Sequence, residues 1–321
     1  MDKKLTTPIL FLVFDRPDKT QKVFDVIRKA QPKKLYVAAD APRDGNENDT
    51  IQCQKVREIV KQVDWNCETH YLFHEKNLGC SLAGKSAWDW FFSHEKEMIF
   101  IEDDGLVTNS FFYYCQELLR KYRNDEHIAY IGGVNFGLKY GTASYFFTRC
   151  SVSTYAMATW KRVYDLYDYD LESYPAIRNT KDFQGQFVNR FERDRELTNY
   201  DDYVKSVKSG HRRNTYDLQM WYLVRKYNKW CIYPNLNQAT NIGFDLDGSN
   251  TAVDPNSDYA KSHTRPRYEL TEIIHPDKVG IDMKFEKKMF KQRKLYDQSV
   301  LKAMFWFYVL SFYRNFIKRK L

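Results

Sequence analysis

The chain has 321 residues, of which 43% are hydrophobic and 17% aromatic, and its formal net charge is +8. This composition is typical of a globular protein with a sizeable core and excludes a disordered or fibrous chain. The positive charge favours an anionic partner. The sequence has no nucleic-acid-binding motif and no zinc-ligand spacing, so we expect no nucleic acid among its partners.

Cysteine usage and the N-terminal sequence indicate a compartment. Six cysteines are scattered along the chain without a Cys-x-x-Cys pair, which predicts free thiols in a reducing environment. The first residues lack the long apolar run of a signal peptide. We therefore expect the body of the protein to lie in the cytoplasm.

Strands and helices are expected to alternate over the first hundred residues. The apolar runs 8–14, 35–39 and 70–73 predict buried strands, and each precedes a segment expected to be helical. Pro17 suits the first position of the helix after the first strand. This alternation predicts a mainly parallel sheet with helices on both faces. Neither GxxxxGK[ST] nor GxGxxG occurs, so phosphate groups would have to be held by a metal and by basic side chains.

The strand expected at 97–101 ends in three consecutive acidic residues, Glu102, Asp103 and Asp104. Ligands of open α/β sheets bind just beyond the carboxyl ends of the strands. Three adjacent carboxylates repel one another, and Mg²⁺ or Mn²⁺ relieves that repulsion while leaving coordination positions for phosphate and water. A solvated acidic turn is the alternative interpretation, but the position after a buried strand favours a cation site.

Four short segments occur in an informative order. They are the acidic triplet followed by 109–112 (Asn-Ser-Phe-Phe), then 155–160 (Tyr-Ala-Met-Ala-Thr-Trp), 216–221 (Tyr-Asp-Leu-Gln-Met-Trp) and 234–244 (Pro-Asn-Leu-Asn-Gln-Ala-Thr-Asn-Ile-Gly-Phe). Together they resemble GT-A glycosyltransferases, which use nucleotide-diphosphate sugars. The resemblance is to bacterial surface-polysaccharide glycosyltransferases and to the Golgi N-acetylglucosaminyltransferase branch with its Glu-Asp-Asp metal motif.

The resemblance spans roughly residues 8 to 280 and has two departures. Ala156-Met157 replaces Gly-Trp, and Tyr216 replaces a tryptophan. Both positions are expected to lie in the cleft for the acceptor and the donor sugar. The resemblance implies an α/β, Rossmann-like GT-A fold with a mixed, mainly parallel sheet flanked by helices. The catalytic domain would cover 1–280, and 281–321 would be a basic, aromatic tail.

The implied activity is metal-dependent transfer of a sugar, with inversion, from a nucleotide-diphosphate sugar such as a UDP-sugar. The acceptor would be a glycan or a lipid-linked glycan of a bacterial surface polysaccharide. Two alternatives stay open. One is a sugar nucleotidyltransferase, and the other is a catalytically inactive, membrane-docked glycan-binding protein.

The resemblance also implies roles for the acidic residues. Asp104 would hold Mn²⁺ or Mg²⁺, and Glu102 and Asp103 would contact ribose or metal-bound water. Asp217 would be the general base that takes the proton of the acceptor hydroxyl. The alternative for Asp217 is an acid that stabilises the first turn of a helix.

Four further residues have weaker assignments. Arg16 and Asp40 follow the first two strands and would contact the nucleotide, with a surface salt bridge and a turn acid as the alternatives. Lys76 is a candidate for the diphosphate. His275 is a candidate late metal ligand, although a lone histidine before a proline is more often structural.

Two segments differ from the rest in composition. The charge-rich stretch 161–213 is expected to be a solvated, mobile insertion over the active site. The apolar run 303–313 is about half the length of a membrane span, and its aromatic residues are bounded by Lys and Arg. This pattern predicts a helix in the interface of an anionic membrane, which would make the protein peripheral at the cytoplasmic face of the bacterial inner membrane. A helix that closes onto the core is the alternative.

Overall fold

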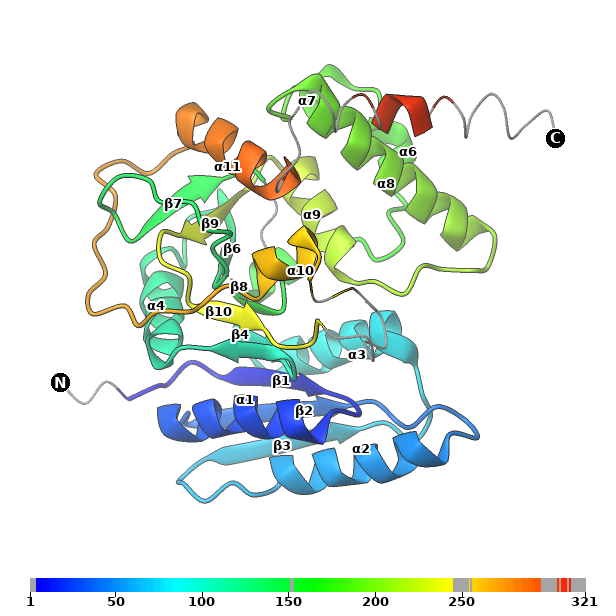
Figure 1. Ribbon diagram of the computed structural model, residues 1–321, viewed down its shortest axis with the longest axis vertical. Helices are drawn as coiled ribbons and strands as arrows, with labels where there is room; N and C mark the ends of the chain where they lie inside the picture. Colours follow the sequence, from blue (N-terminus) through cyan, green and yellow to red (C-terminus); the bar gives the residue numbers. More distant parts are fainter. Residues whose placement is uncertain are drawn as a thin grey trace.

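The computed structural model describes residues 4–150, 153–244, 254, 256–295, 305, 307–310 and 312. The strands are β1 (Ile9–Val13), β2 (Lys34–Ala39), β3 (Glu68–Phe73), β4 (Glu97–Glu102), β5 (Gly105–Val107), β6 (Ile128–Gly132), β7 (Tyr145–Thr148), β8 (Ala156–Trp160), β9 (Trp230–Pro234) and β10 (Ala239–Asn241). An eight-stranded sheet has the order β3-β2-β1-β4-β8-β6-β9-β7, and β10 pairs with β5 in a second sheet (Figure 1).

The large sheet is mixed and mainly parallel, as predicted. The pairs β1–β2, β2–β3, β1–β4 and β6–β9 are parallel, whereas β8 is antiparallel to β4 and β6, and β7 is antiparallel to β9. Six strands therefore run in one direction. The apolar runs expected to form strands are β1 to β4, with bounds that differ by no more than two residues.

The helices are α1 (Pro17–Ala30), α2 (Glu47–Val60), α3 (Gly79–His94), α4 (Asn109–Lys121), α5 (Lys161–Tyr164), α6 (Tyr174–Ile177), α7 (Lys181–Gln184), α8 (Arg190–Lys208), α9 (Asp217–Lys226), α10 (Asp258–His263) and α11 (Met283–Leu295). The connections β1-α1-β2 and β2-α2-β3 step across the sheet in one direction, and β3-α3-β4 steps back. Right-handed crossovers therefore place α1 and α2 on one face and α3 on the other (Figure 1).

The first half of the chain folds in this way for local reasons. Pro17 occupies the first turn of α1, and Val23, Phe24 and Ile27 form the buried face of that helix. The register places Leu12 of β1 opposite Glu102 of β4. The two neighbouring parallel strands therefore end together, and the polar residues that follow them lie at one edge of the sheet.

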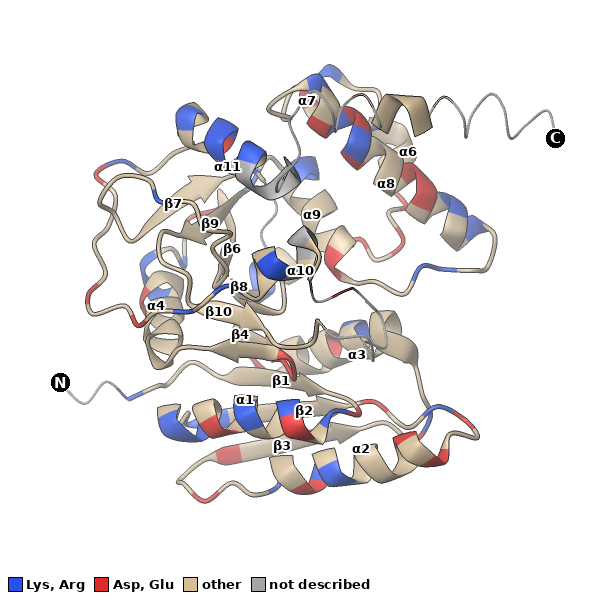
Figure 2. Cartoon of the chain, in the orientation of Figure 1, with Lys and Arg blue, Asp and Glu red and all other residues tan. Residues whose placement is uncertain are grey.

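The segment between β8 and α9 contains α5, α6, α7 and α8, and together with α9 it forms a second hydrophobic core. The buried members of this core are Leu171, Tyr174, Phe183, Leu197, Tyr200, Tyr203, Leu218 and Tyr222. Charged residues of both signs occur along α8 (Figure 2). The expectation of a solvated insertion is therefore wrong, because tyrosine and phenylalanine rings from several short elements pack together without a helical period in the sequence.

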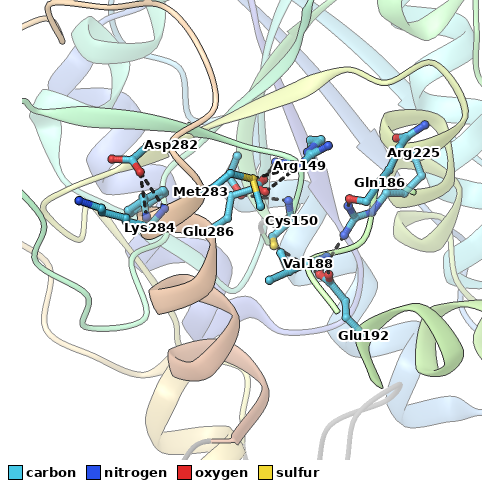
Figure 3. Close-up of polar contacts among 12 residues, drawn as sticks. Arg149, Cys150, Gln186, Val188, Glu192, Arg225, Asp282, Met283, Lys284 and Glu286 are labelled. Carbon is cyan, nitrogen blue, oxygen red and sulfur yellow. Dashed lines mark hydrogen bonds and ion pairs between the residues drawn. The ribbon is translucent and has the colours of Figure 1, made fainter. Parts of the chain in front are cut away.

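A buried ion cluster joins this insertion to α9. Arg225 of α9 donates to Glu192 (2.9 Å) and Glu196 (3.4 Å) of α8, and its side chain is 1% exposed. It also donates to the carbonyl oxygen of Gln186 at 2.8 Å. Figure 3 shows Arg225, Gln186 and Glu192 facing one another beside Cys150. A buried charge is tolerated only when it is paired in this manner.

The helix α11 packs on the main body of the protein. Phe285 and Met289 belong to the main hydrophobic core, and buried Glu286 forms an ion pair with Arg149 at 3.0 Å (Figure 3). The predicted boundary after residue 280 therefore precedes a helix that shares the core of the domain.

Part of the aromatic tail contacts α8. The ring of Phe307 lies 5.3 Å from that of Phe191, and the Tyr308 hydroxyl donates to Asp194 at 2.9 Å. Phe305 and Leu310 are 62% and 61% exposed. The basic residues of the tail after position 312 lie outside the described residues. Within the described part of the chain, no helix is long and apolar enough to span a membrane.

Candidate active site

A cavity of about 650 Å³ lies at the carboxyl ends of β1, β2 and β4. Its walls come from the residues that follow these strands, from the start of α3, from the segment that leads into α9 and from the segment after β10. Figure 2 shows the acidic residues at the end of β4, near the middle of the view. The cavity has the location expected for the ligand site of an open α/β sheet.

Six of the eight residues predicted for the site line this cavity. They are Arg16, Asp40, Glu102, Asp103, Asp104 and Asp217. Lys76 is exposed and does not line the cavity. His275 does not line it either, because its Nδ1 lies 2.8 Å from the hydroxyl of Tyr145. The structure therefore does not bring His275 to the acidic triplet, and its contact is the structural one that was the alternative.

Asp104 is held between two polar side chains. Its Oδ2 accepts a hydrogen bond from Nη1 of Arg16 at 3.2 Å, and its Oδ1 accepts one from Nδ2 of Asn241 at 3.1 Å. The side chains of Arg16 and Asp104 are 16% and 15% exposed. Gly243 lies against this pair, since an added Cβ would be 2.7 Å from Nη1 of Arg16. A side chain at position 243 would therefore displace the Asp104 carboxylate or the Arg16 guanidinium.

The other two acids of the triplet have different partners. Glu102 accepts a hydrogen bond from the hydroxyl of Tyr216, whose ring packs against Gly84 so closely that no Cβ fits there. Oδ2 of Asp103 accepts the backbone N–H of Phe14 at 3.1 Å. Asp103 is therefore turned toward the end of β1, and Glu102 is turned toward the start of α9.

Burial and mutual repulsion disfavour the charged forms of the triplet. Burial raises the pKa of Glu102 to about 8, and the charge of Asp104 adds to that shift. Burial likewise raises the pKa of Asp103 to about 7, with Asp104 as the next cause. The pKa of Asp104 is raised by burial, although the Arg16 guanidinium opposes the shift. A cation beside these carboxyls would favour their ionised forms.

The carboxylate of Asp40 accepts hydrogen bonds from backbone N–H groups. Its two oxygens accept N–H groups from Ala41, Leu78 and Gly79 at 2.9–3.1 Å. The side chain is buried at the cavity wall. It therefore fixes the loop that precedes α3, which agrees with the alternative of a turn acid.

Asp217 is the first residue of α9 and lines the cavity. Its Oδ1 accepts a hydrogen bond from the hydroxyl of Thr215. The preceding residue, Tyr216, is the partner of Glu102, so one short segment presents the candidate base beside the triplet. Tyr216 and Glu102 are separated by 114 residues in the sequence, so no local sequence pattern predicts this contact.

The donor set suits a cation that is shared with a ligand. Within the described ranges, no group of three or more His, Cys, Asp or Glu side chains could hold a metal by itself. Mg²⁺ and Mn²⁺ are commonly bound by one or two carboxylates, with water and substrate phosphates in the remaining positions. The carboxyl-rich wall around Asp104 fits that mode of binding.

The structure adds two cavity-lining residues that were not predicted, Asn241 and Gly243, and Tyr216, which was expected in the cleft, lines the same cavity. All three fall in segments that carry the family resemblance. Ala156 and Met157 instead lie in β8, buried and paired with Ile101 and Phe100 of β4. The departure at these two positions therefore lies within the sheet and outside the cavity.

No family model and no curated relative matches the chain. Among solved structures, S. aureus TarS 1–349 matches with 10% identity and a TM-score of 0.35, over 52% of this chain and 51% of that chain. TarS 1–349 in complex with UDP-GlcNAc matches with 14% identity and a TM-score of 0.27, over 43% and 38% of the two chains. Apo-UDP-glucose pyrophosphorylase matches with 8% identity and a TM-score of 0.39, over 74% and 93%. This chain thus spans about half of the TarS chain.

Proposed function

We propose that this protein is a metal-dependent glycosyltransferase. It would transfer a sugar, with inversion, from a nucleotide-diphosphate sugar such as a UDP-sugar to a glycan or lipid-linked acceptor of a bacterial surface polysaccharide. The observation that carries the proposal is the shared cavity. Glu102, Asp103, Asp104, Arg16 and Asp217 line one space at the carboxyl ends of parallel strands.

The charge of the cavity supports metal dependence. The residues that line it include six carboxylates, from Asp15, Asp40, Glu102, Asp103, Asp104 and Asp217, but only three guanidinium groups, from Arg16, Arg43 and Arg213. When these carboxyl groups are ionised, such a surface repels a diphosphate unless a cation is bound. Asp104 would hold Mn²⁺ or Mg²⁺, with Glu102 or Asp103 touching its water or the ribose. The bound cation would supply charge neutralisation for the departing diphosphate.

Asp217 would act as the general base. An ionised carboxylate at the cavity wall can accept the proton of an acceptor hydroxyl as that oxygen attacks the anomeric carbon. The Thr215 hydroxyl donates to one oxygen of Asp217 and so fixes the orientation of the carboxylate. Arg16, which is paired with Asp104, lies where it can contact a phosphate oxygen.

The connection after β1 argues against a nucleotidyltransferase. Such an enzyme should carry a basic, glycine-rich loop next to its first strand. Here β1 ends at Val13 and α1 begins at Pro17, so only residues 14–16 connect them, and none is glycine. The second alternative, an inactive glycan-binding protein, would have no need of Asp217.

Donor hydrolysis tests the proposal. The protein is incubated with a panel of UDP-sugars and Mn²⁺, and released UDP is measured for wild type, Asp217→Asn and the surface control Asp165→Asn. We expect slow hydrolysis by wild type and the control. In a transfer assay, Asp217→Asn should lower the rate by about 10²- to 10⁴-fold with unchanged UDP affinity. Release of pyrophosphate from UTP and a sugar phosphate would instead identify a nucleotidyltransferase. Equal transfer rates for Asp217→Asn and wild type would move the base elsewhere. Asp245 and Asp247 would then be the next candidates, and both lie outside the described residues.

We also propose that the tail attaches the protein to an anionic membrane surface at the cytoplasmic face. Exposed Phe305, Leu310 and Phe312 and the basic sequence at 314–320 support it. Each Lys or Arg near such a surface contributes about 1 kcal/mol. The contacts of Phe307 and Tyr308 with α8 would leave other rings of the tail to meet the lipid.

A further inference from the structure

The arginines that line the cavity differ in their partners. Arg16 is paired with Asp104 at 3.2 Å. Arg43 is paired with Asp49 at 2.8 Å and with Asp15 at 3.3 Å. Both guanidinium groups are therefore already neutralised by carboxylates of the protein.

Arg213 is the exception among the cavity-lining arginines of the described chain. Its guanidinium has no carboxylate partner within those residues, although the same cavity is rich in carboxylates. The residue is exposed. It lies four residues before Asp217, on the segment that joins α8 to α9.

The backbone on both sides of Arg213 is anchored. The preceding residue, Arg212, is ion-paired with Asp170 and lies 4.7 Å from the ring centroid of Tyr169. The following residue, Asn214, accepts the backbone N–H of Ser81 at 2.7 Å. The carbonyl of Arg213 itself accepts the N–H of Thr215 at 2.9 Å. The backbone at Arg213, a residue that lines the cavity, is thus held in place on both sides.

Two anions could meet Arg213 in this cavity, the diphosphate of the donor and an anionic group of the acceptor. The diphosphate of a donor belongs beside the acidic triplet and Arg16, at the ends of β1 and β4. The acceptor hydroxyl must instead reach Asp217, and Arg213 lies on the segment that carries Asp217. A guanidinium binds phosphate or carboxylate through paired, charge-assisted hydrogen bonds.

We propose that Arg213 binds an anionic group, a phosphate or a carboxylate, on the acceptor. This inference rests on the proposed function, since it assumes that Asp217 marks the acceptor side of the cavity. It makes the acceptor an acidic glycan or a phosphate-bearing glycan. Arg213 is then a specificity-determining residue.

The test measures the binding of simple glycosides to the full-length protein saturated with UDP and Mn²⁺. The probes are methyl glucoside 6-phosphate, methyl glucuronoside and neutral methyl glucoside, and their affinities are obtained by ligand-observed NMR. We expect at least one anionic probe to bind wild type about tenfold more tightly than the neutral one, and which of the two it is separates phosphate from carboxylate. Arg213→Gln should abolish that preference, and Arg213→Lys should restore part of it. The control Lys208→Gln, which removes a charge from α8 outside the cavity, should keep it.

Each other outcome overturns the inference. Equal affinities of wild type for charged and neutral probes would refute it while leaving the proposed function intact, because UDP would still bind. A loss of Mn²⁺-dependent UDP affinity in Arg213→Gln would assign the residue to the donor. A wild-type protein that does not bind UDP with Mn²⁺ would refute the proposed function and this inference with it.

Discussion

Substitution of Gly243 by alanine is a direct test of the Asp104 site. Gly243 lies after β10, and its backbone N–H donates to the side chain of Asn241 at 2.7 Å. An alanine Cβ would lie 2.7 Å from Nη1 of Arg16 and 2.8 Å from Cγ of Asp104, and closer still to Oδ2 of Asp104. The change therefore acts on the Arg16–Asp104 pair without removing either residue.

The size of the effect follows from these distances. Carbon atoms in contact are normally about 3.5–4.0 Å apart, so the Asp104 carboxylate must move by about 1 Å. A misplacement of about 1 Å in an active site can lower activity by about 10²-fold. We expect Mn²⁺-dependent UDP affinity and the transfer rate to fall by about that factor. The fold should persist, because position 243 does not have a left-handed backbone.

Isothermal titration calorimetry with UDP and Mn²⁺, together with thermal unfolding, provides the measurement. Asp165→Asn, the surface substitution used above, is the control, since Asp165 does not line the cavity. Wild-type UDP affinity in a folded Gly243→Ala protein would refute the reasoning, because the position of Asp104 would then have no role in binding.

Three further predictions concern Asp104, the pH dependence of stability and the C-terminal tail. Asp104→Asn should lower Mn²⁺-dependent UDP affinity by at least about 100-fold while the fold persists, and unchanged affinity by calorimetry would exclude Asp104 as a ligand. Because the pKa values of Glu102 and Asp103 are raised to about 8 and about 7 in the folded state, the cation-free protein should lose stability as pH rises from 5 to 8. Mn²⁺ should reduce this loss, and a flat profile of unfolding midpoint against pH would contradict it. Cutting the chain after Tyr296 should release the protein from anionic liposomes with donor hydrolysis unchanged, and aggregation of the shortened protein would show that the tail completes the core.

The sheet could be predicted because its signals are local. The apolar runs of β1 and β4 predict strands regardless of the rest of the chain. The proline at the start of α1 likewise predicts the first turn of a helix from local sequence alone. The acidic triplet was found for the same reason, since it directly follows a buried strand. Asp217 came from its segment's resemblance to a family pattern.

The parts that were missed depend on contacts between distant residues. Asn241 reaches Asp104 across 137 positions of sequence, and no local spacing encodes such a pair. Lys76 and His275 have plausible residue types, but the loop after β3 leaves Lys76 exposed and Tyr145 holds His275. The core of the insertion was missed because four-residue helices such as α6 and α7 are too short to show a period.

The buried pairing of Arg225 with Glu192 and Glu196 has a consequence for engineering this protein. Removing one partner of a buried ion pair typically costs about 3–5 kcal/mol, since it leaves an uncompensated charge. A deletion of the insertion that carries α8 would therefore leave the Arg225 guanidinium without its two carboxylate partners (Figure 3). A minimal version of the protein must replace Arg225 with an apolar residue in the same step, and a chimera that exchanges the insertion must carry Arg225 and its two glutamates together as one unit.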